Sequence, residues 1–220
     1  MIYQATSSGS ETNCYLLEEE GYAIIIDPGA GKEISEIIKE HDMKPEYIFL
    51  THEHFDHIWD LEEIRDMYDI PVVACRLCSD GVQDKGSNLS SIADLLSYFK
   101  TGVVPETKSK VFTCRGADIV FDDTFNLEWR GHSFDFQRLP GHSPGSVIIT
   151  MDDSLDFTGD YLIYGEEEIT RLKGGSTEDY NSIARPVLEA IPQGRKIYPG
   201  HGIVYRKGME QEHGLGNLHE

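Results

Sequence analysis

The chain has 220 residues, of which 39 are acidic and 19 basic, giving a net charge of −20 at pH 7. This charge disfavours nucleic acids and anionic membrane surfaces as partners, because phosphate groups would meet a repulsive field. No apolar run approaches the roughly 20 residues of a membrane span. The polar stretch 1–13 lacks the features of a secretory signal, so a cytoplasmic protein is expected.

The first 75 residues alternate between short apolar runs and amphipathic stretches. Strands are predicted at 13–17, 22–26, 47–51 and 72–75, the first two forming a hairpin. Between them, apolar spacing predicts helices that begin near Ile34 and Ile58 and end near His41 and at Pro71.

The segment from about 76 to 110 interrupts this alternation and is predicted to be an inserted helical segment. Its apolar side chains recur at helical spacing: Leu89, Ile92, Leu95, Leu96 and Phe99. Such a stripe must pack on the domain or on another chain. It could form a cover over the functional site, a homodimer surface, or a helix that fills a surface groove.

The second half reads as short strands followed by a helix and a final strand. Strands are predicted at 119–121, 125–129, 134–139, 147–151, 155–158 and 197–198. A helix over 177–191 contains Pro186 and should be kinked there. The whole pattern predicts one α/β domain over 1–205, with two sheets sandwiched by helices, and a polar tail over 206–220.

Four cysteines do not make a disulfide framework in a chain of this length. Cys75-x-x-Cys78 could be a redox or zinc pair. It follows an apolar run and has no second such pair, so two ordinary thiols at a strand end are the favoured interpretation.

The strongest chemical signal is Thr51-His52-Glu53-His54-Phe55-Asp56-His57, where three imidazoles and a carboxylate follow an apolar strand. A divalent ion takes several nitrogen and oxygen ligands, and a loop at a strand end can aim alternate side chains at one point. One side of this loop carries His52 and His54, and the other carries Asp56 and His57. A solvated loop would explain the aspartate but not three histidines in six residues.

Three later turns repeat the arrangement. His142, Asp160 and His201 each follow a predicted strand and have neighbouring glycines that permit sharp turns. Other histidines are given ordinary roles: His41 belongs to a helix face or end, and His132, His213 and His219 are expected at the surface.

The series His52-x-His54-x-Asp56-His57, His142, Asp160 and His201 resembles the metallo-β-lactamase superfamily from about residue 2 to 205. The numbers of residues between successive members of the series His57, His142, Asp160 and His201 are 84, 17 and 40, which is compatible with it. The resemblance implies an αββα four-layer sandwich, with Asp27 and Asn13 as supporting residues. It also implies two metal sites, the first with His52, His54 and His142, the second with Asp56, His57 and His201, and both bridged by Asp160.

Two residues indicate which branch of the superfamily the chain resembles. His54 stands where flavodiiron oxygen reductases have Glu, and Asp160 stands where zinc β-lactamases usually have Cys or Ser. The set is therefore similar to the glyoxalase II group of hydroxyacylglutathione hydrolases and to related lactonases. The stretch 170–175 resembles a segment of small glyoxalase II-like proteins, which suggests Arg171 as a substrate-binding residue. Tyr161 and Tyr164 follow Asp160 and could donate to a substrate oxyanion, although packing is the favoured role. The C-terminal helical region that binds glutathione in glyoxalase II has no counterpart after His201, which puts glutathione in question.

The resulting expectation is a hydrolase of a small thioester or ester with two Zn²⁺ per chain, or iron or a mixed pair. A hydroxide between the two metals would be the nucleophile, with Asp56 as the catalytic residue that orients it. The alternatives are a lactonase, and a persulfide dioxygenase with one iron held by His52 or His54, His142 and Asp160. A non-catalytic binding module would usually have lost ligands, and all seven are present.

Overall fold

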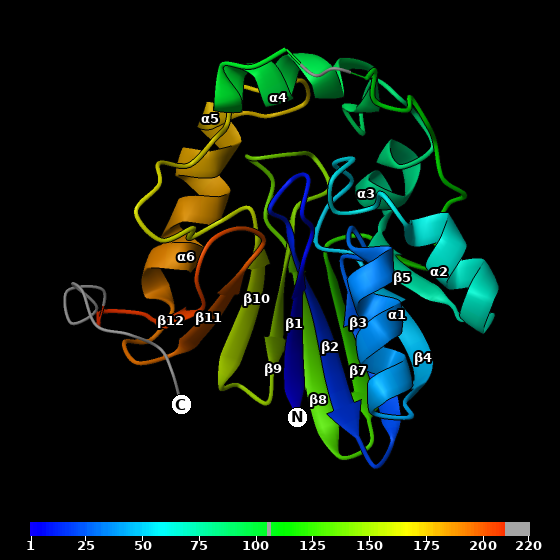
Figure 1. The fold of residues 1–220 in the computed structure, drawn as a ribbon. Coiled ribbons are helices and arrows are strands. Elements are labelled where there is room, and N and C mark those ends of the chain that lie inside the picture. The colour runs from blue at the N-terminus through cyan, green and yellow to red at the C-terminus, as the bar shows by residue number, and fades with distance from the viewer. Residues whose placement is uncertain (105–106, 210–220) are drawn as a thin grey trace.

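The structure is a computed structural model that describes residues 1–104 and 107–209. Two six-stranded sheets pack face to face in its centre (Figure 1). The first sheet has the order β1 (Ile2–Thr6), β2 (Asn13–Glu19), β3 (Tyr22–Ile26), β4 (Lys44–Phe49), β5 (Val72–Cys75) and β6 (Ile119–Phe121). The second has the order β12 (Tyr205–Arg206), β11 (Lys196–Pro199), β10 (Leu155–Gly159), β9 (Val147–Met151), β8 (His132–Arg138) and β7 (Thr124–Trp129).

Strand direction follows from the length of each connection. The strands β1, β2 and β3 are antiparallel, whereas β3 to β6 are parallel and need crossover segments. In the second sheet β7 to β10 form an antiparallel meander, and β11 then joins β10 in parallel. Because β4, β10 and β11 end on the same side of the sandwich, polar residues that follow them meet there.

Helices cover the outer faces of both sheets. Helices α1 (Gly31–Glu40) and α2 (Leu61–Tyr68) lie beside the first sheet (Figure 1). The helical stretch α5 (Thr177–Asp179), η2 (Tyr180–Ala184) and α6 (Arg185–Ala190) lies beside the second, over a small cluster made of Leu139, Ile148, Tyr161, Ala184 and Leu188. The predicted αββα sandwich in a single domain is therefore confirmed.

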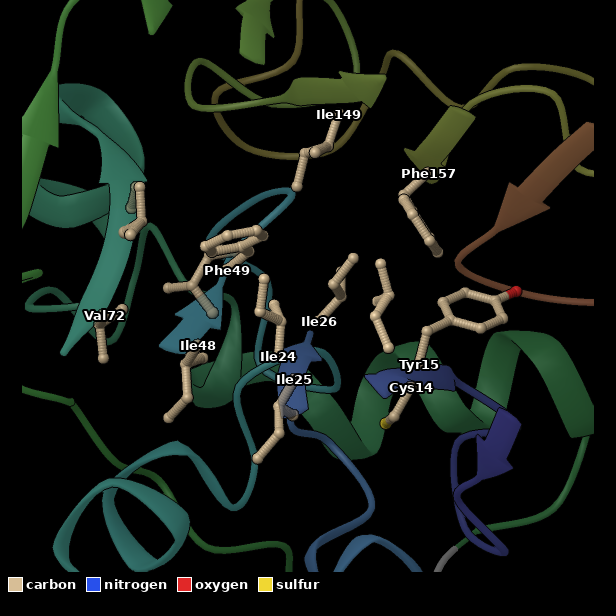
Figure 2. Packing of buried hydrophobic residues seen from close by; sticks show 14 of the residues in the cluster. Cys14, Tyr15, Ile24, Ile25, Ile26, Ile48, Phe49, Val72, Ile149 and Phe157 are labelled. Atoms are coloured by element: carbon tan, nitrogen blue, oxygen red, sulfur yellow. The ribbon is translucent and has the colours of Figure 1, made fainter. Parts of the chain in front are cut away.

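The main core lies between the sheets and is rich in aromatic rings. Phe49 of β4 meets Phe134 and Phe136 of β8 at ring-centroid distances of 5.4 and 4.9 Å. Figure 2 shows Phe49 among the buried isoleucines of β3 and near Ile149 of the second sheet. Burying such aromatic and branched side chains contributes about 1.5–3 kcal/mol each, which fixes the two sheets that position the strand ends.

Two edge strands differ from the sequence prediction. β1 was not predicted because Ile2–Thr6 is a short segment interrupted by the polar residues Gln4 and Thr6, and it pairs with β2 along its whole length. β12 extends the fold beyond the predicted boundary at residue 205, since Arg206 pairs with Lys196. Lys207 Nζ then donates to the carbonyl oxygens of Leu188, Glu189 and Ile191 at the end of α6. The rest of the predicted tail, with His213 and His219, lies outside the described residues.

The helix predicted over 177–191 contains an irregular turn close to Pro186. Residues Tyr180–Ala184 form a π-helical turn just before Pro186, at the start of α6. Proline lacks an N–H and its ring crowds the preceding turn, so a wider turn there accommodates it.

The segment 76–110 lies in the crossover between the parallel strands β5 and β6. It contains α3 (Arg76–Gly81), the short η1 (Ser90–Ile92) and α4 (Ala93–Thr101). In Figure 1, α4 crosses the top of the molecule between α5 and α3. Cys75 and Cys78 are buried free thiols, and Cys75 Sγ accepts a hydrogen bond from Cys78 N at the start of α3. Among the helices in the described ranges, none is both long and apolar enough to cross a membrane.

Candidate metal centre

The seven side chains that the sequence singled out meet at one end of the sandwich. They come from the loop after β4, the turn after β8, and the ends of β10 and β11. They fall into two groups, and within each group the ligand-type atoms lie within 4.8 Å of one another. The first group is His52, His54, His142 and Asp160, and the second is Asp56, His57 and His201.

Asp160 lies between the two groups. Its Oδ2 is 3.4 Å from His142 Nε2 and 3.9 Å from His52 Nε2. Its Oδ1 is 3.1 Å from His57 Nε2 and 3.6 Å from His201 Nε2. One carboxylate thus presents a separate oxygen to each group.

The second group is completed by Asp56. Its Oδ2 lies 3.2 Å from His201 Nε2 and 3.8 Å from His57 Nε2. The same oxygen is 3.0 Å from Thr12 Oγ1, in the loop between β1 and β2. Because an ionised carboxylate only accepts hydrogen bonds, the Thr12 hydroxyl is the donor.

In three of the five histidines, a hydrogen bond to the far side of the imidazole fixes which nitrogen faces the centre. His57 Nδ1 lies 3.0 Å from Asp27 Oδ2, His142 Nδ1 lies 2.8 Å from Ile169 O, and His201 Nδ1 lies 3.1 Å from Glu11 O. Each acceptor places a proton on Nδ1, so Nε2 is the nitrogen that points inward and can bind a cation. Such outer partners are typical of metal-binding histidines.

His54 is oriented differently from the other four. Its Nδ1 lies 2.9 Å from His142 Nε2, so both nitrogens converge on the first group. His52 completes the group, and its Nδ1 contacts Thr51 Oγ1 at 3.1 Å.

The charge states in the cluster suit a cation. Burial lowers the pKa of His54 to about 3 and also lowers the pKa values of His52 and His142, so these rings are neutral at pH 7. Burial opposes ionisation of Asp160, yet the neighbouring histidines His201 and His57 outweigh it and hold its pKa below the usual value. Burial opposes protonation of His57 and His201, yet the carboxylates of Asp160 and Asp56 outweigh it and raise the pKa values of both rings, so a cation that binds the second group would displace a proton from them.

Several buried atoms in this cluster have no hydrogen-bond partner. They are His52 Nε2, His54 Nε2, His57 Nε2 and Asp160 Oδ1. Buried polar atoms are normally paired, because leaving one unpaired costs about 1–3 kcal/mol. Three of the four face the centre, and a bound cation would satisfy them, so the residues present fit a metal pair.

Two polar residues support the loop that carries His52 to His57. Asp27 accepts hydrogen bonds from Thr51 N at 2.7 Å and from Thr51 Oγ1 at 2.5 Å, in addition to its contact with His57. Glu53 is almost fully buried, and its carboxylate accepts from Ser143 Oγ at 2.9 Å. Gly145 lies so close to Glu53 that a Cβ at that position would overlap the carboxylate.

The remaining turns are held from the N-terminal side of the chain. Asn13 Nδ2 donates to Pro199 O at 3.0 Å and to Gly202 O at 2.9 Å, which fixes the turn that carries His201. Within that turn, a Cβ on Gly200 would lie 2.5 Å from Asp160 Oδ1, so only glycine fits. Tyr161 is buried, accepts from His142 N at 2.9 Å and donates to Leu139 O at 2.8 Å, which is a supporting role.

Neither of the two suggested substrate residues is part of the seven-residue cluster. Tyr164 packs on Tyr205 with ring centroids 5.5 Å apart and lines a separate cavity with Lys196 and Ile203. Arg171 is exposed, in the loop before Gly174 and Gly175. His41 follows α1 with its Nδ1 3.4 Å from Tyr3 Oη, and His132 contacts Asp152 and Glu19 at the surface.

Sequence reasoning missed Thr12, Glu53 and Ser143. The first lies in a polar loop that carries no periodic pattern, and its contact with Asp56 spans 44 residues. Glu53 and Ser143 are sequence neighbours of predicted ligands, in the two turns that carry histidines. This position was the signal that could have identified them.

Comparison with known proteins agrees with this geometry. The family model described as the metallo-beta-lactamase superfamily matches residues 8–201, so the chain belongs to this superfamily of metal-dependent hydrolases. Among curated proteins, it is 31% identical to "Probable metallo-hydrolase YqgX" of Bacillus subtilis, over 87% of this chain and 85% of that protein. It is 29% identical to "Hydroxyacylglutathione hydrolase GloC" of Haemophilus influenzae, over 91% and 90% of the two chains.

Solved structures show the same fold. "BLEG-1 B3 metallo-beta-lactamase" superposes with a TM-score of 0.82 and 28% identity, covering 97% of each chain. "TTHA1623 in a di-iron-bound form" superposes with a TM-score of 0.68 and 25% identity, covering 95% of this chain and 96% of that one.

Proposed function

We propose that this metal-dependent hydrolase binds two zinc ions and cleaves small thioesters or esters. The observation that carries the proposal is the division of the Asp160 carboxylate, with Oδ2 toward His142 and Oδ1 toward His57. A carboxylate placed in this way suits a bridge between two cations, and each group supplies three further ligands. Five imidazoles with two carboxylates suit zinc, and iron accepts the same donor types.

Bound divalent ions would polarise a substrate carbonyl and lower the pKa of water, which supplies a nucleophile at neutral pH. The chain's own residues would orient the reactants. Asp56, held by Thr12 and His201, would accept a hydrogen bond from the attacking water and fix its direction. The acceptors Asp27, Ile169 O and Glu11 O keep the imidazoles in one orientation through the reaction.

Similarity to a protein named as a hydroxyacylglutathione hydrolase supports a thioester substrate. An alternative reaction and an alternative metal are each supported by a specific similarity. Similarity to a B3 metallo-beta-lactamase makes β-lactam hydrolysis a second candidate, and a lactone is chemically close to both. Similarity to a di-iron protein makes iron the second candidate metal. A persulfide dioxygenase with one iron would use only the first group and leave Asp56, His57 and His201 without a role.

The charge of −20 supports a small-molecule substrate and disfavours nucleic acids and membrane surfaces as partners. Four buried free thiols suit a reducing compartment, which supports a cytoplasmic location.

The test combines metal analysis with a substrate panel under anaerobic conditions. We expect close to two ions per chain, and oxygen-independent cleavage of a thioester or ester by the zinc-loaded protein. Cleavage of a chromogenic cephalosporin or a lactone in place of acyclic esters would assign one of the rival hydrolases. Activity that requires iron, O₂ and a persulfide would overturn the proposal.

A further inference from the structure

The cavity beside the metal centre has an acidic rim. It is lined by His142 and Asp160 of the centre and by Ile163, Glu166, Glu167, Glu168 and Ile169. Its lining residues include no lysine or arginine. The rim (residues 163–169) is therefore apolar at its two ends and carries three consecutive carboxylates between them.

The rim is anchored to the centre. Ile169 O contacts His142 Nδ1 at 2.8 Å, so the last residue of the rim is tied directly to a predicted metal ligand. Glu168 accepts a hydrogen bond from Leu162 N at 2.9 Å, and Glu166 N donates to Ile163 O at 3.1 Å. These bonds keep the carboxylates beside the cavity.

The three glutamates do not contribute equally to its charge. Burial raises the pKa of Glu168 to about 7, so this residue is only partly ionised near neutral pH. Glu166 and Glu167 are exposed, and they supply the lasting negative charge of the rim.

The nearest basic residues in the chain do not cancel this charge inside the cavity. Lys173 Nζ lies 3.8 Å from Asp84, across the gap to the crossover segment, and is already paired. Arg171 is exposed and does not line the cavity. Beyond the rim, the net charge of −20 makes the surrounding field negative as well.

The same cavity borders atoms that call for a ligand. Asp160, which lines it, has its Oδ1 buried without a hydrogen-bond partner. His52 and His57 of the same centre do not line the cavity, and their Nε2 atoms are also buried without a partner. The reacting carbonyl of a substrate would lie at this positively charged centre once cations are bound. The rest of the substrate then extends over the rim, whose negative charge is opposite in sign to that of the metal-bound centre.

We propose that the substrate portion lying over residues 163–169 is uncharged or cationic, and that thioesters of neutral or cationic thiols are preferred to those of anionic thiols such as glutathione. This inference rests on the proposed thioester hydrolysis and adds to it the class of leaving group. Methylene groups of such a thiol can pack on Ile163 and Ile169, while Glu166 and Glu167 repel a carboxylate and attract an ammonium group.

The test uses one acyl group on four thiols. The acetyl thioesters of thiocholine, N-acetylcysteamine, 3-mercaptopropionate and glutathione carry cationic, neutral, anionic and net anionic leaving groups. With the zinc-loaded protein at low salt, we expect kcat/KM for the first two to exceed that for the anionic pair by about 10-fold, and the gap to narrow as salt rises.

Substitutions in the rim test whether its glutamates cause this substrate preference. Glu166→Gln combined with Glu167→Gln should raise kcat/KM for the 3-mercaptopropionate thioester by about 3- to 10-fold and leave the neutral substrate within about twofold. Glu40→Gln, an exposed change on α1, is the matched control and should alter neither. A preference for the anionic thioesters, or a preference that depends on Arg171→Gln and not on the glutamates, would overturn the inference.

A binding measurement separates this inference from the proposed function. Thioether analogues with an acetonyl group in place of the acetyl group cannot be hydrolysed, and calorimetry gives their dissociation constants. If no thioester is cleaved but the thiocholine analogue binds more tightly than the mercaptopropionate analogue, the proposed reaction fails and the charge preference stands. Tighter binding of the anionic analogue would refute the preference whatever the reaction is.

Discussion

The carboxylate of Glu53 accepts a hydrogen bond from Ser143 Oγ at 2.9 Å, which joins the two turns that carry His54 and His142. Glu53 is 1% exposed and is packed against Gly145 and Gly81. Burial raises the pKa of Glu53 to about 7, so this side chain ties the two histidine turns together while it is only partly ionised near neutral pH.

Replacing this residue should therefore weaken metal binding. Glu53→Gln keeps the shape but can place an NH₂ group against the Ser143 hydroxyl, which weakens the bond between the two turns, so we expect zinc affinity to fall about 10-fold. Stability should fall by about 1–3 kcal/mol. Competition with a chelator and urea unfolding measure the two effects, and Glu63→Gln on the exposed side of α2 is the control. Unchanged zinc affinity in Glu53→Gln would show that the residue only fills space.

Thr12 should act through Asp56. Its hydroxyl donates to Asp56 Oδ2 at 3.0 Å and also lies 2.8 Å from Ser10 Oγ. Thr12→Val keeps the volume and removes the donor, so kcat should fall about 10- to 100-fold, the range expected for losing an outer partner of a metal ligand.

Thr12→Ser provides the matched variant, because it restores the hydroxyl in the same place and should recover most of the activity. Elemental analysis of all three proteins is needed beside the kinetics. Equal kcat in the valine and serine variants would contradict a role for this hydrogen bond.

Asp160 should matter more for metal content than any other residue of the cluster. Its two oxygens face different groups, so Asp160→Ala removes a contact from both, and Asp160→Asn leaves one good acceptor. We expect the alanine variant to retain less than one ion per chain after dialysis and the asparagine variant to retain about one. Elemental analysis decides this.

His41→Ala is the control for that measurement, since His41 lies at the end of α1 beside Tyr3 and outside the cluster. Its metal content should equal that of the wild type. Two ions in Asp160→Asn, with normal affinity for both, would show that the carboxylate does not bridge.

The sequence was most informative where apolar runs end in polar turns. The strands β3 and β5 are continuous buried runs, and their predicted bounds agree with the structure. Ligand-type residues after β4, β10 and β11 were expected to form one site because their series resembles that of the metallo-β-lactamase superfamily. Edge strands and supporting contacts were not accessible in this way. β1 carries too little apolar pattern, and the Thr12–Asp56 and Glu53–Ser143 contacts join residues 44 and 90 positions apart.

A pH-dependent contribution to stability is expected from Glu46. Its carboxylate accepts from Arg130 Nε and Nη2, each at 2.9 Å, and from Trp129 Nε1 at 2.8 Å. The hydrogen bond from Arg130, aided by Trp129, outweighs burial and holds the pKa of Glu46 below 4.5. Because the folded pKa is depressed, the stabilisation is present above the unfolded pKa and is lost as pH falls through the folded one.

Glu46→Gln should therefore cost about 1–2 kcal/mol at neutral pH, and the difference from the wild type should shrink as pH falls below 4.5. Urea unfolding of both proteins across this range measures the difference. Glu128→Gln, an exposed change on β7, should give a curve parallel to the wild type. A difference that stays constant with pH would mean that the charge of Glu46 is not involved.

In the crossover segment 76–110, we expect Leu89 to stabilise the fold and the apolar side chains of α4 to contribute to substrate binding. Leu89 is 1% exposed, whereas Phe99 on α4 is 74% exposed, and Leu96 is half-buried. Leu89→Ala should thus destabilise the fold by about 2–5 kcal/mol, and Phe99→Ala by less than about 1 kcal/mol. Chemical unfolding of the two variants tests this contrast.

α4 crosses the top of the molecule between α3 and α5 (Figure 1), and a cover over the functional site is one of the roles that the sequence leaves open for its apolar stripe. We expect Phe99→Ala and Leu96→Ala to raise KM for acyl thioesters with long chains while acetyl thioesters and metal content stay unchanged. Sedimentation at two protein concentrations distinguishes a homodimer surface, which would give a concentration-dependent loss of assembly in Phe99→Ala. If both variants only lower stability, α4 is structural and does not shape substrate choice.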